Sequence, residues 1–368
     1  MYVGFPHMGN AHIGIRGLFK ALGILTIDLP PVNRLTVELG AKYSPECSCL
    51  PFKTVLGNYI QALEKGADCL IMLGGCGPCR FGYFGNLQEK ILRDLGYDFK
   101  MIILEPLDWR QTLRQLQETF SPVSWKQLIY ASRLAWGKTV AADTIESFSH
   151  FYRARQSRPG IITGIYQRGL EKIDKAYDLA SLRTIVKEVE GEMKAAVLPF
   201  EPEIKIALIG DIYTLIEPYV NYQTDLKLGE KGVQVERSIY SSRWLKENFI
   251  PWEKKKKRRK MLRDAKGYLK NMVGGHGLDT IANAVRYSRE GFDGIIQILP
   301  MTCMPEIVAE SILPRVAEDY QIPIMSLAVD EHSSDTGLQT RLEAFIDLIA
   351  QRKKDKKDYF LSKVHEAS

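Results

Sequence analysis

The feature that most constrains the fold is a set of short apolar runs separated by helical patterns. The run at 69–73 is apolar at every position, which is typical of a strand buried on both faces of a parallel sheet. A helical pattern follows at 84–95, where Gly96 provides a C-cap, and another strand-like run occupies 99–104. Such alternation of strands and helices predicts a parallel sheet with helices on both faces.

The same alternation defines two α/β domains. It covers residues 1–107, stops over residues 108–200 and returns over residues 201–350, while residues 351–368 form a charged tail. In the middle segment, apolar residues three or four positions apart indicate one face of an amphipathic helix. These are Leu182, Ile185, Val189, Met193 and Val197. We therefore expect two three-layer α/β domains joined by a mainly helical region, because 368 residues exceed the size of one usual core.

Five of the six cysteines lie in three short loops that are rich in glycine and proline. The loops span residues 45–51, 74–80 and 300–305, and the second and third directly follow strand-like runs. Their cysteines are Cys47, Cys49, Cys76, Cys79 and Cys303. Glycine and proline bend the backbone sharply and leave N–H groups free to face an anion. Because ligands bind beyond the carboxyl ends of strands in open α/β sheets, we expect these thiolates to meet around a metal centre.

The spacing of the cysteines favours an iron–sulfur cluster over zinc. A C-x₂-C unit, which structural zinc sites usually carry in pairs, occurs once, at Cys76 and Cys79. Ligands drawn from distant loops suit a cluster between domains, and cluster irons prefer thiolates. Lys53, Arg80 and helix N-termini would offset the negative charge of such a cluster. Cys69 lies inside an apolar run and is interpreted as a small buried hydrophobe. A zinc site is the alternative.

Proton donors are harder to identify. Asp330, Glu331 and His332 follow the strand-like run at 324–329 and are candidates to supply a proton. Acidic loop residues more often face solvent or cap a helix, and no acid–base pair or nucleophile motif accompanies them. The chain also lacks a P-loop motif, so we expect no ATP binding by the chain itself.

The charge pattern does not point to nucleic acid. Much of the net charge of +6 comes from basic runs at 254–260 and 352–357. No aromatic residues are interspersed and no known nucleic-acid motif is present, so a solvated helix face is the preferred interpretation. No apolar run is long enough to span a membrane, and the first residues lack the pattern of an export signal. We expect a cytoplasmic protein with reduced thiols.

Four strings in order along the chain resemble the 2-hydroxyacyl-CoA dehydratase superfamily. They are Cys49–Lys53 (CLPFK), Gly77–Tyr83 (GPCRFGY), Cys303–Glu306 (CMPE) and Thr340–Phe345 (TRLEAF). The most similar branch comprises the CoA-protein activases and activator-associated dehydratase-like proteins, which are related to double-cubane cluster proteins. The similarity covers both α/β halves and is weakest in the helical middle.

The resemblance implies flavodoxin-like or Rossmann-like domains that hold a [4Fe–4S] cluster between them. Cys49, Cys79 and Cys303 match the positions of three ligands best. It also implies a partner, an ATP-hydrolysing activator that supplies low-potential electrons, and a small-molecule substrate that receives them in a dehydratase or reductase reaction. A homodimer is a further implication.

The chain departs from the dehydratase pattern in its cysteines. The additional Cys47 and Cys76 indicate a larger ligand set, and a double-cubane cluster with six ligands would require Cys69 as well. Dehydration of a CoA thioester is therefore one expectation among others. A non-catalytic cluster-binding relay or maturation protein is the alternative function.

Overall fold

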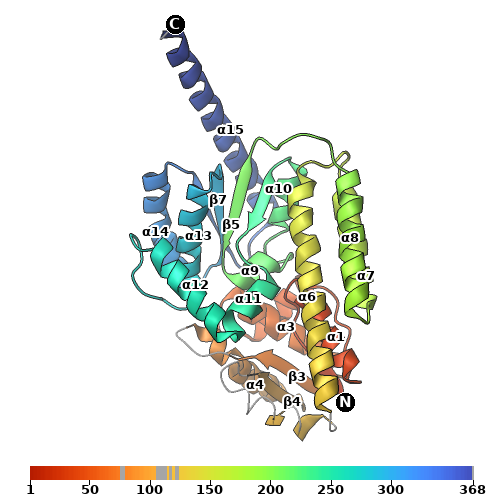
Figure 1. The fold of residues 1–368 in the computed structure, drawn as a ribbon. Helices are drawn as coiled ribbons and strands as arrows, with labels where there is room; N and C mark the ends of the chain where they lie inside the picture. Colours follow the sequence, from red (N-terminus) through yellow and green to blue (C-terminus); the bar gives the residue numbers. More distant parts are fainter. Residues whose placement is uncertain (75–78, 105–113, 116–117, 121–123, 367–368) are drawn as a thin grey trace.

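Two four-stranded parallel sheets form the framework of the protein (Figure 1). The computed structural model describes residues 1–74, 79–104, 114–115, 118–120 and 124–366. The first sheet contains β1 (Tyr2–Gly4), β2 (Leu25–Thr26), β3 (Cys69–Leu73) and β4 (Lys100–Leu104). The second contains β5 (Lys205–Gly210), β6 (Gln234–Arg237), β7 (Gly294–Pro300) and β8 (Ile324–Val329). The predicted α/β class with two parallel sheets is confirmed.

Both sheets have the same strand order. The first sheet runs β2-β1-β3-β4 and the second runs β6-β5-β7-β8, so the first strand of each half lies inside its sheet. After β2 the chain crosses over β1 to form β3 on its other side, and after β6 it crosses over β5 to form β7. Ligands of open parallel sheets bind at such a reversal, here between the carboxyl ends of β1 and β3 and of β5 and β7. The central strands β3 and β7 are almost wholly buried, as their apolar composition predicts.

In the first half, helices connect the strands and fix the cysteine loops. They are α1 (Ala11–Ala21), α2 (Arg34–Tyr43), α3 (Leu50–Glu64), the 3₁₀ turn η1 (Arg80–Tyr83) and α4 (Phe84–Asp94). The sequence analysis did not identify α2, which Asn33 caps with a reciprocal side-chain and backbone pair to Thr36. Helices α2 and α3 approach so closely that Gly40 lies against the backbone of Lys53, and Gly57 against that of Thr36.

The middle of the chain is helical, as predicted. It contains α6 (Trp125–Arg153), α7 (Ile161–Lys175) and α8 (Leu179–Ala195), which share an apolar core with one another. Helix α6 packs on α1 and also on β6, so it contacts both α/β halves. In Figure 1 it runs along the front of the molecule from the first half to the second.

The second half carries seven helices. They are α9 (Ile212–Ile216), α10 (Thr224–Glu230), α11 (Ser241–Phe249), α12 (Pro251–Asp264), α13 (Gly277–Arg289), α14 (Met304–Tyr320) and α15 (Asp335–Glu366). Helix α15 continues through residue 350, where the charged tail was expected to begin, and its end projects away from the body in Figure 1. Within the described residues, no helix combines the length and the apolar composition needed to cross a bilayer.

The two α/β halves share one apolar core and several polar contacts. The hydroxyl of Tyr213 donates to the carbonyl of His7 at 3.3 Å, and the N–H of Gly9 donates to the carboxylate of Glu217 at 2.9 Å. A Cβ at Gly9 would lie 2.2 Å from the carbonyl oxygen of Ile216. These contacts fix one half against the other at the edge where the cysteine loops lie.

Replacing Gly40 with alanine is expected to destabilise the protein. A Cβ at this position would lie 1.7 Å from the carbonyl oxygen of Lys53, so α2 must move away from α3. We expect a loss of about 3 kcal/mol in the free energy of unfolding, measured by urea denaturation. Gly191→Ala is the matched control, because a Cβ there meets nothing within 4 Å and should stabilise α8 by up to about 1 kcal/mol. Equal stability of both variants would contradict the close approach of α2 and α3.

Glu217 is expected to make stability depend on pH. Burial raises the pKa of Glu217 to about 7, and the N–H groups of Gly9 and Tyr219 oppose that rise. Between the usual pKa of a glutamate and about 7, the folded chain keeps a proton that the unfolded chain releases, so stability falls as pH rises through this range. Glu217→Gln keeps an acceptor for Gly9 without the charge. Its stability should gain on that of the wild type by roughly 2–3 kcal/mol between pH 5 and pH 8.

Urea denaturation at several pH values measures this difference. Glu318→Gln, at an exposed position on α14, is the control and should follow the wild-type profile. Parallel profiles for Glu217→Gln and the wild type would show that the Glu217 carboxyl does not titrate as described.

Candidate metal centre

Three of the predicted ligands occupy the same structural position, the residue before a helix. Cys49 precedes α3, Cys79 precedes η1 and thus α4, and Cys303 precedes α14. Proline follows within the first turn of α3 and of α14, as predicted, and does not interrupt either helix. None of the three thiols makes a capping hydrogen bond, so their sulfurs are free to bind a ligand.

Arg80 joins the three cysteine loops. Its Nη1 donates to the carbonyl of Cys47 at 3.0 Å, and its Nη2 donates to the carbonyl of Thr302 at 2.8 Å. Since Arg80 itself follows Cys79, one guanidinium holds together the loops of Cys47 and Cys49, of Cys79, and of Cys303. These loops therefore meet through Arg80 where the two halves adjoin.

A fourth loop closes against the same place. A Cβ at Gly275 would lie 3.9 Å from the Cys79 sulfur and 3.0 Å from Cγ of Pro305, in the first turn of α14. Gly275 adopts φ of +44°, which glycine accepts readily. The loop before α13 is thus in contact with residues on both sides of the candidate centre.

The three thiols share an environment that keeps them protonated in the absence of a metal. Burial raises the pKa of Cys49 to about 11 and also raises the pKa of Cys79 and of Cys303. The carboxylate of Asp211 adds to each rise. The N–H groups at the helix starts lie beyond capping distance but close enough to oppose the rise.

Asp211 and His276 form a polar pair beside the cysteines. Asp211 caps α9, with Oδ2 accepting from the N–H groups of Tyr213 and Thr214, and its Oδ1 lies 3.6 Å from Nδ1 of His276. The indole N–H of Trp244 donates to Nε2 of His276 at 3.2 Å. Because Nε2 is an acceptor, Nδ1 carries the proton of the neutral ring and faces Asp211.

The charge state of His276 follows from this geometry. Burial lowers the pKa of His276, but the Asp211 carboxylate more than offsets that effect and leaves the pKa raised. An imidazolium would turn an N–H toward the indole N–H of Trp244, which disfavours the charged form. With the Trp244 donor at Nε2, the His276 ring is neutral and its proton is on Nδ1.

A buried carboxyl lies below Cys303. Glu306 accepts hydrogen bonds from the Thr280 hydroxyl at 3.0 Å and from the Gln297 amide at 2.9 Å. Burial raises the pKa of Glu306 to about 7, and the Gln297 hydrogen bond opposes that rise. Glu306 thereby ties the start of α14 to β7 and α13.

The charged residues expected to act at the cluster or to supply a proton are engaged with other groups. Lys53 is buried and forms an ion pair with Glu331 across the two halves. Asp330 accepts from the N–H of His332 at 3.0 Å and from the Ser333 hydroxyl at 2.8 Å, which closes a turn. The His332 side chain is 86% exposed. In this arrangement Glu331 neutralises Lys53, and Asp330 shapes the loop.

The remaining cysteines differ in position. Cys47 is exposed, on the loop whose carbonyl Arg80 binds. Cys69 is fully buried within β3, where the sequence placed it as a packing residue. Cys76 lies outside the described residues.

Sequence reasoning placed Asp211 only in a loop after a strand and Glu306 only in a string that resembles the family, and it did not single out Trp244. It considered His276 as one of four histidines that could bind a metal or move a proton, and preferred a hydrogen-bonded loop residue. Asp211 directly follows β5, and this position after a strand was the signal that marked its loop as part of a ligand-binding edge. Trp244 is on α11 and becomes relevant only through its contact with His276, which no local pattern encodes.

The described residues contain no preformed site for a single metal ion. Within them, no group of three or more His, Cys, Asp or Glu side chains has a suitable arrangement. A single ion binds all of its ligands at one point, whereas the thiolates of a cubane bind different irons and lie farther apart.

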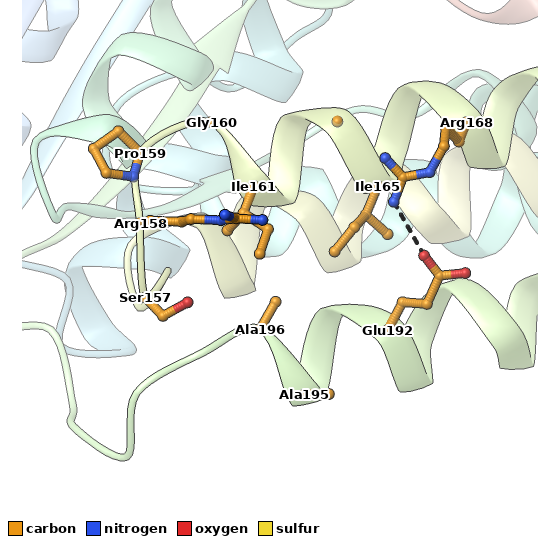
Figure 2. A pocket seen from close by; sticks show the side chains of 11 residues that line it. Ser157, Arg158, Pro159, Gly160, Ile161, Ile165, Arg168, Glu192, Ala195 and Ala196 are labelled. Atoms are coloured by element: carbon orange, nitrogen blue, oxygen red, sulfur yellow. Dashed lines mark hydrogen bonds and ion pairs between the residues drawn. The ribbon is translucent and has the colours of Figure 1, made fainter.

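A surface hollow lies away from the cysteine loops. It has a volume of about 770 Å³ and lies between the start of α7 and the end of α8 (Figure 2). Arg158 and Arg168 line it, and Arg168 is paired with Glu192 at 3.2 Å. None of its lining residues comes from the cysteine loops, so it has no part in the candidate centre.

Comparison with models of known protein families and with curated proteins finds no match to this chain. The resemblance described above therefore depends on four short strings, and function must be argued from the site.

Replacing Arg80 with lysine is expected to loosen the candidate centre. A lysine has one point-like donor group and cannot span two carbonyls as the planar guanidinium does. In metal-free protein we expect Cys49, Cys79 and Cys303 to react several-fold faster with a maleimide, as followed by peptide mass spectrometry. Arg34→Lys, at an exposed i,i+4 pair on α2, is the control. Unchanged labelling rates in Arg80→Lys would show that Arg80 does not hold the loops together.

Proposed function

We propose that the protein holds an iron–sulfur cluster between its two α/β halves and uses it to pass low-potential electrons to a small molecule. Cys49, Cys79 and Cys303 are its proposed ligands, with Cys47 or Cys76 completing the set. The observation that carries the proposal is the convergence of three uncapped cysteines, each at the start of a helix, on the guanidinium of Arg80. A cluster would supply one-electron chemistry at this place.

The residues around the cysteines have definable tasks in this proposal. Arg80 orients the loops and offsets negative charge at the thiolates. Cys49, Cys79 and Cys303 are half-buried, which limits the access of water to their sulfurs. His276 holds a proton on Nδ1, oriented by Asp211 and Trp244, and is better placed than Asp330, Glu331 or His332 to move a proton near the sulfurs.

The fold is consistent with this assignment. The strand order of each sheet corresponds to that of a flavodoxin-like domain, a Rossmann-related arrangement in which the ligand lies beside the loops after the first and third strands. Cys79 follows β3, the third strand in spatial order, and Cys303 follows β7, the equivalent strand of the second sheet. The 2-hydroxyacyl-CoA dehydratase superfamily, including its activator-dependent and double-cubane branches, is the family we propose.

The exposed face of α12 is the surface that we propose for an electron-donating partner, such as an ATP-hydrolysing activator. Six exposed cations lie on this helix, and in the described part of the chain none of them is in an ion pair. They are Lys254, Lys255, Lys256, Arg258, Arg259 and Lys260. The helix is fixed to α13 by the pair of Lys257 with Asp279 at 3.3 Å, three residues beyond His276. An acidic protein would be attracted to this face at low ionic strength.

A non-catalytic relay is the second candidate function. The engagement of Glu331 with Lys53 and of Asp330 within its own turn favours it, because these residues are then unavailable for acid–base chemistry. Changes in the cluster's spin-resonance spectrum upon addition of candidate acyl-CoA thioesters would favour the enzyme over the relay.

The protein purified without oxygen, and then reconstituted with iron and sulfide, should be brown and contain about four irons per chain or more. Cys49→Ser, Cys79→Ser and Cys303→Ser should each lose most of this iron, while Cys69→Ala, at a buried strand position, should retain it. Iron and sulfide are quantified by colorimetric assay and thiolate-to-iron bands by visible absorption. A colourless, iron-free product from the reconstituted wild type, or a product that binds zinc in preference to iron, would overturn the proposal.

A further inference from the structure

The hollow between the start of α7 and the end of α8 has the size and the lining of a small-molecule site. Its volume of about 770 Å³ lies within the range of about 300–1,000 Å³ that ligand pockets occupy (Figure 2). Its floor includes three apolar side chains, those of Ile161, Ile165 and Ala196. Its charged side chains are few, namely those of Arg158, Arg168 and Glu192. An apolar concave surface with a few charged groups is typical of sites that bind organic molecules.

Small residues keep the hollow open. Gly164 faces it from α7, and a Cβ there would meet only the guanidinium of Arg168, at 3.5 Å. Gly160 adopts φ of +78° before the first turn of α7, and a Cβ there would meet nothing within 4 Å. Ala195 lines the hollow from α8. The space is therefore not taken up by neighbouring atoms, and a side chain as large as leucine at position 164 would occupy it.

The two arginines of the hollow differ in their engagement. Arg168 is paired with Glu192 at 3.2 Å, and this pair closes one end of the hollow. Arg158 lies at the other end, where its side chain extends between the start of α7 and Ala196 (Figure 2). Within the described residues, the Arg158 guanidinium takes part in no ion pair. One cation of the lining is therefore neutralised, and the other is available to an anion.

The remaining charge and length of the hollow define what it can hold. Two arginines and one glutamate give the lining a net charge of +1. The first turn of α7 has no acidic residue and no side-chain cap, so its N–H groups add to the positive potential beside Arg158. From Ile161 to Arg168 the helix advances by about 10 Å, and this stretch presents Ile161, Gly164 and Ile165 to the hollow.

We propose that the hollow binds an organic monoanion, a carboxylate on a flexible apolar chain, of the chemistry of a medium-chain fatty acid. The carboxylate lies at Arg158, whose planar guanidinium matches it, and the chain lies along Ile161 and Ile165. One negative charge neutralises the lining, whereas the two charges of a phosphate monoester would exceed its net charge and be repelled by Glu192. This site is independent of the proposed cluster.

The apolar chain supplies most of the affinity in this proposal. An ion pair at an exposed arginine is weak, because water competes for both charges. Burial of hydrocarbon against the floor adds stability in proportion to the apolar area that leaves water. Both parts of the ligand are therefore needed, and each can be tested separately.

Octanoate is the probe, titrated into the full chain below its micelle concentration and followed by isothermal titration calorimetry. We expect one site per chain, with octanol and octyl phosphate each binding several-fold more weakly. Arg158→Ala should weaken octanoate binding several-fold and remove its advantage over octanol. Arg183→Ala is the matched control, because it removes another exposed arginine near the opposite end of α8 and outside the hollow. Its affinity for octanoate should equal that of the wild type.

A second variant fills the hollow without changing its charge. Gly164→Leu should weaken octanoate binding at least about tenfold, and it should stabilise α7, because leucine favours a helix over glycine. Loss of binding then cannot result from unfolding, which thermal denaturation checks. Gly191→Leu makes the same change at an open position of α8 outside the hollow, and it should bind octanoate as the wild type does.

Four results would each overturn the proposal. They are a wild-type chain that does not bind millimolar octanoate, octanol binding equal to that of octanoate, tighter binding of octyl phosphate than of octanoate, and octanoate binding that Gly164→Leu leaves unchanged.

Discussion

The guanidinium of Arg80 is the contact on which the candidate centre depends. It binds carbonyls of Cys47 and Thr302, which belong to different halves of the chain, and it directly follows Cys79. The other contacts between the halves near this place, such as the pair of Lys53 with Glu331, do not bind the carbonyls of these loops. The same guanidinium places a positive charge near Cys49, whose pKa is raised by burial, and thereby opposes that rise. Arg80 thus both positions the loops and favours the thiolate form.

The repeated strand order explains why the donors meet. Cys79 and Cys303 follow equivalent strands of the two sheets. The helices that precede those strands, α3 and α13, begin after Cys49 and His276, which are therefore equivalent as well. Two sheets whose carboxyl edges face each other bring these four positions together with Asp211. The second half thus offers a histidine where the first offers a cysteine, which makes the two sides chemically unequal.

Much of the framework was predictable because each buried parallel strand carries a short, strong apolar pattern in its own sequence. The run at Cys69–Leu73 coincides with β3, since burial on both faces leaves a continuous apolar signal. The run at Ile324–Val329 coincides with β8, although that strand lies at the edge of its sheet and is only partly buried. At the edge of the first sheet, β2 comprises only Leu25–Thr26. Helix α2 was missed because glycine packing, not apolar periodicity, holds it against α3.

The candidate site could be predicted only in part, for a related reason. Loop composition selects the cysteines, but the partners of a charged side chain are set by the whole fold. Lys53 was expected to face a cluster, and it lies instead against Glu331 from the other half. A buried ammonium group is stable only beside an opposite charge. An ion pair with the adjacent carboxylate of Glu331 offsets its desolvation energy better than a more distant anion would. A buried charge at the boundary of the two halves therefore pairs with an opposite charge across that boundary. Arg80 has no such carboxylate partner and binds the loop carbonyls beside the cysteines instead.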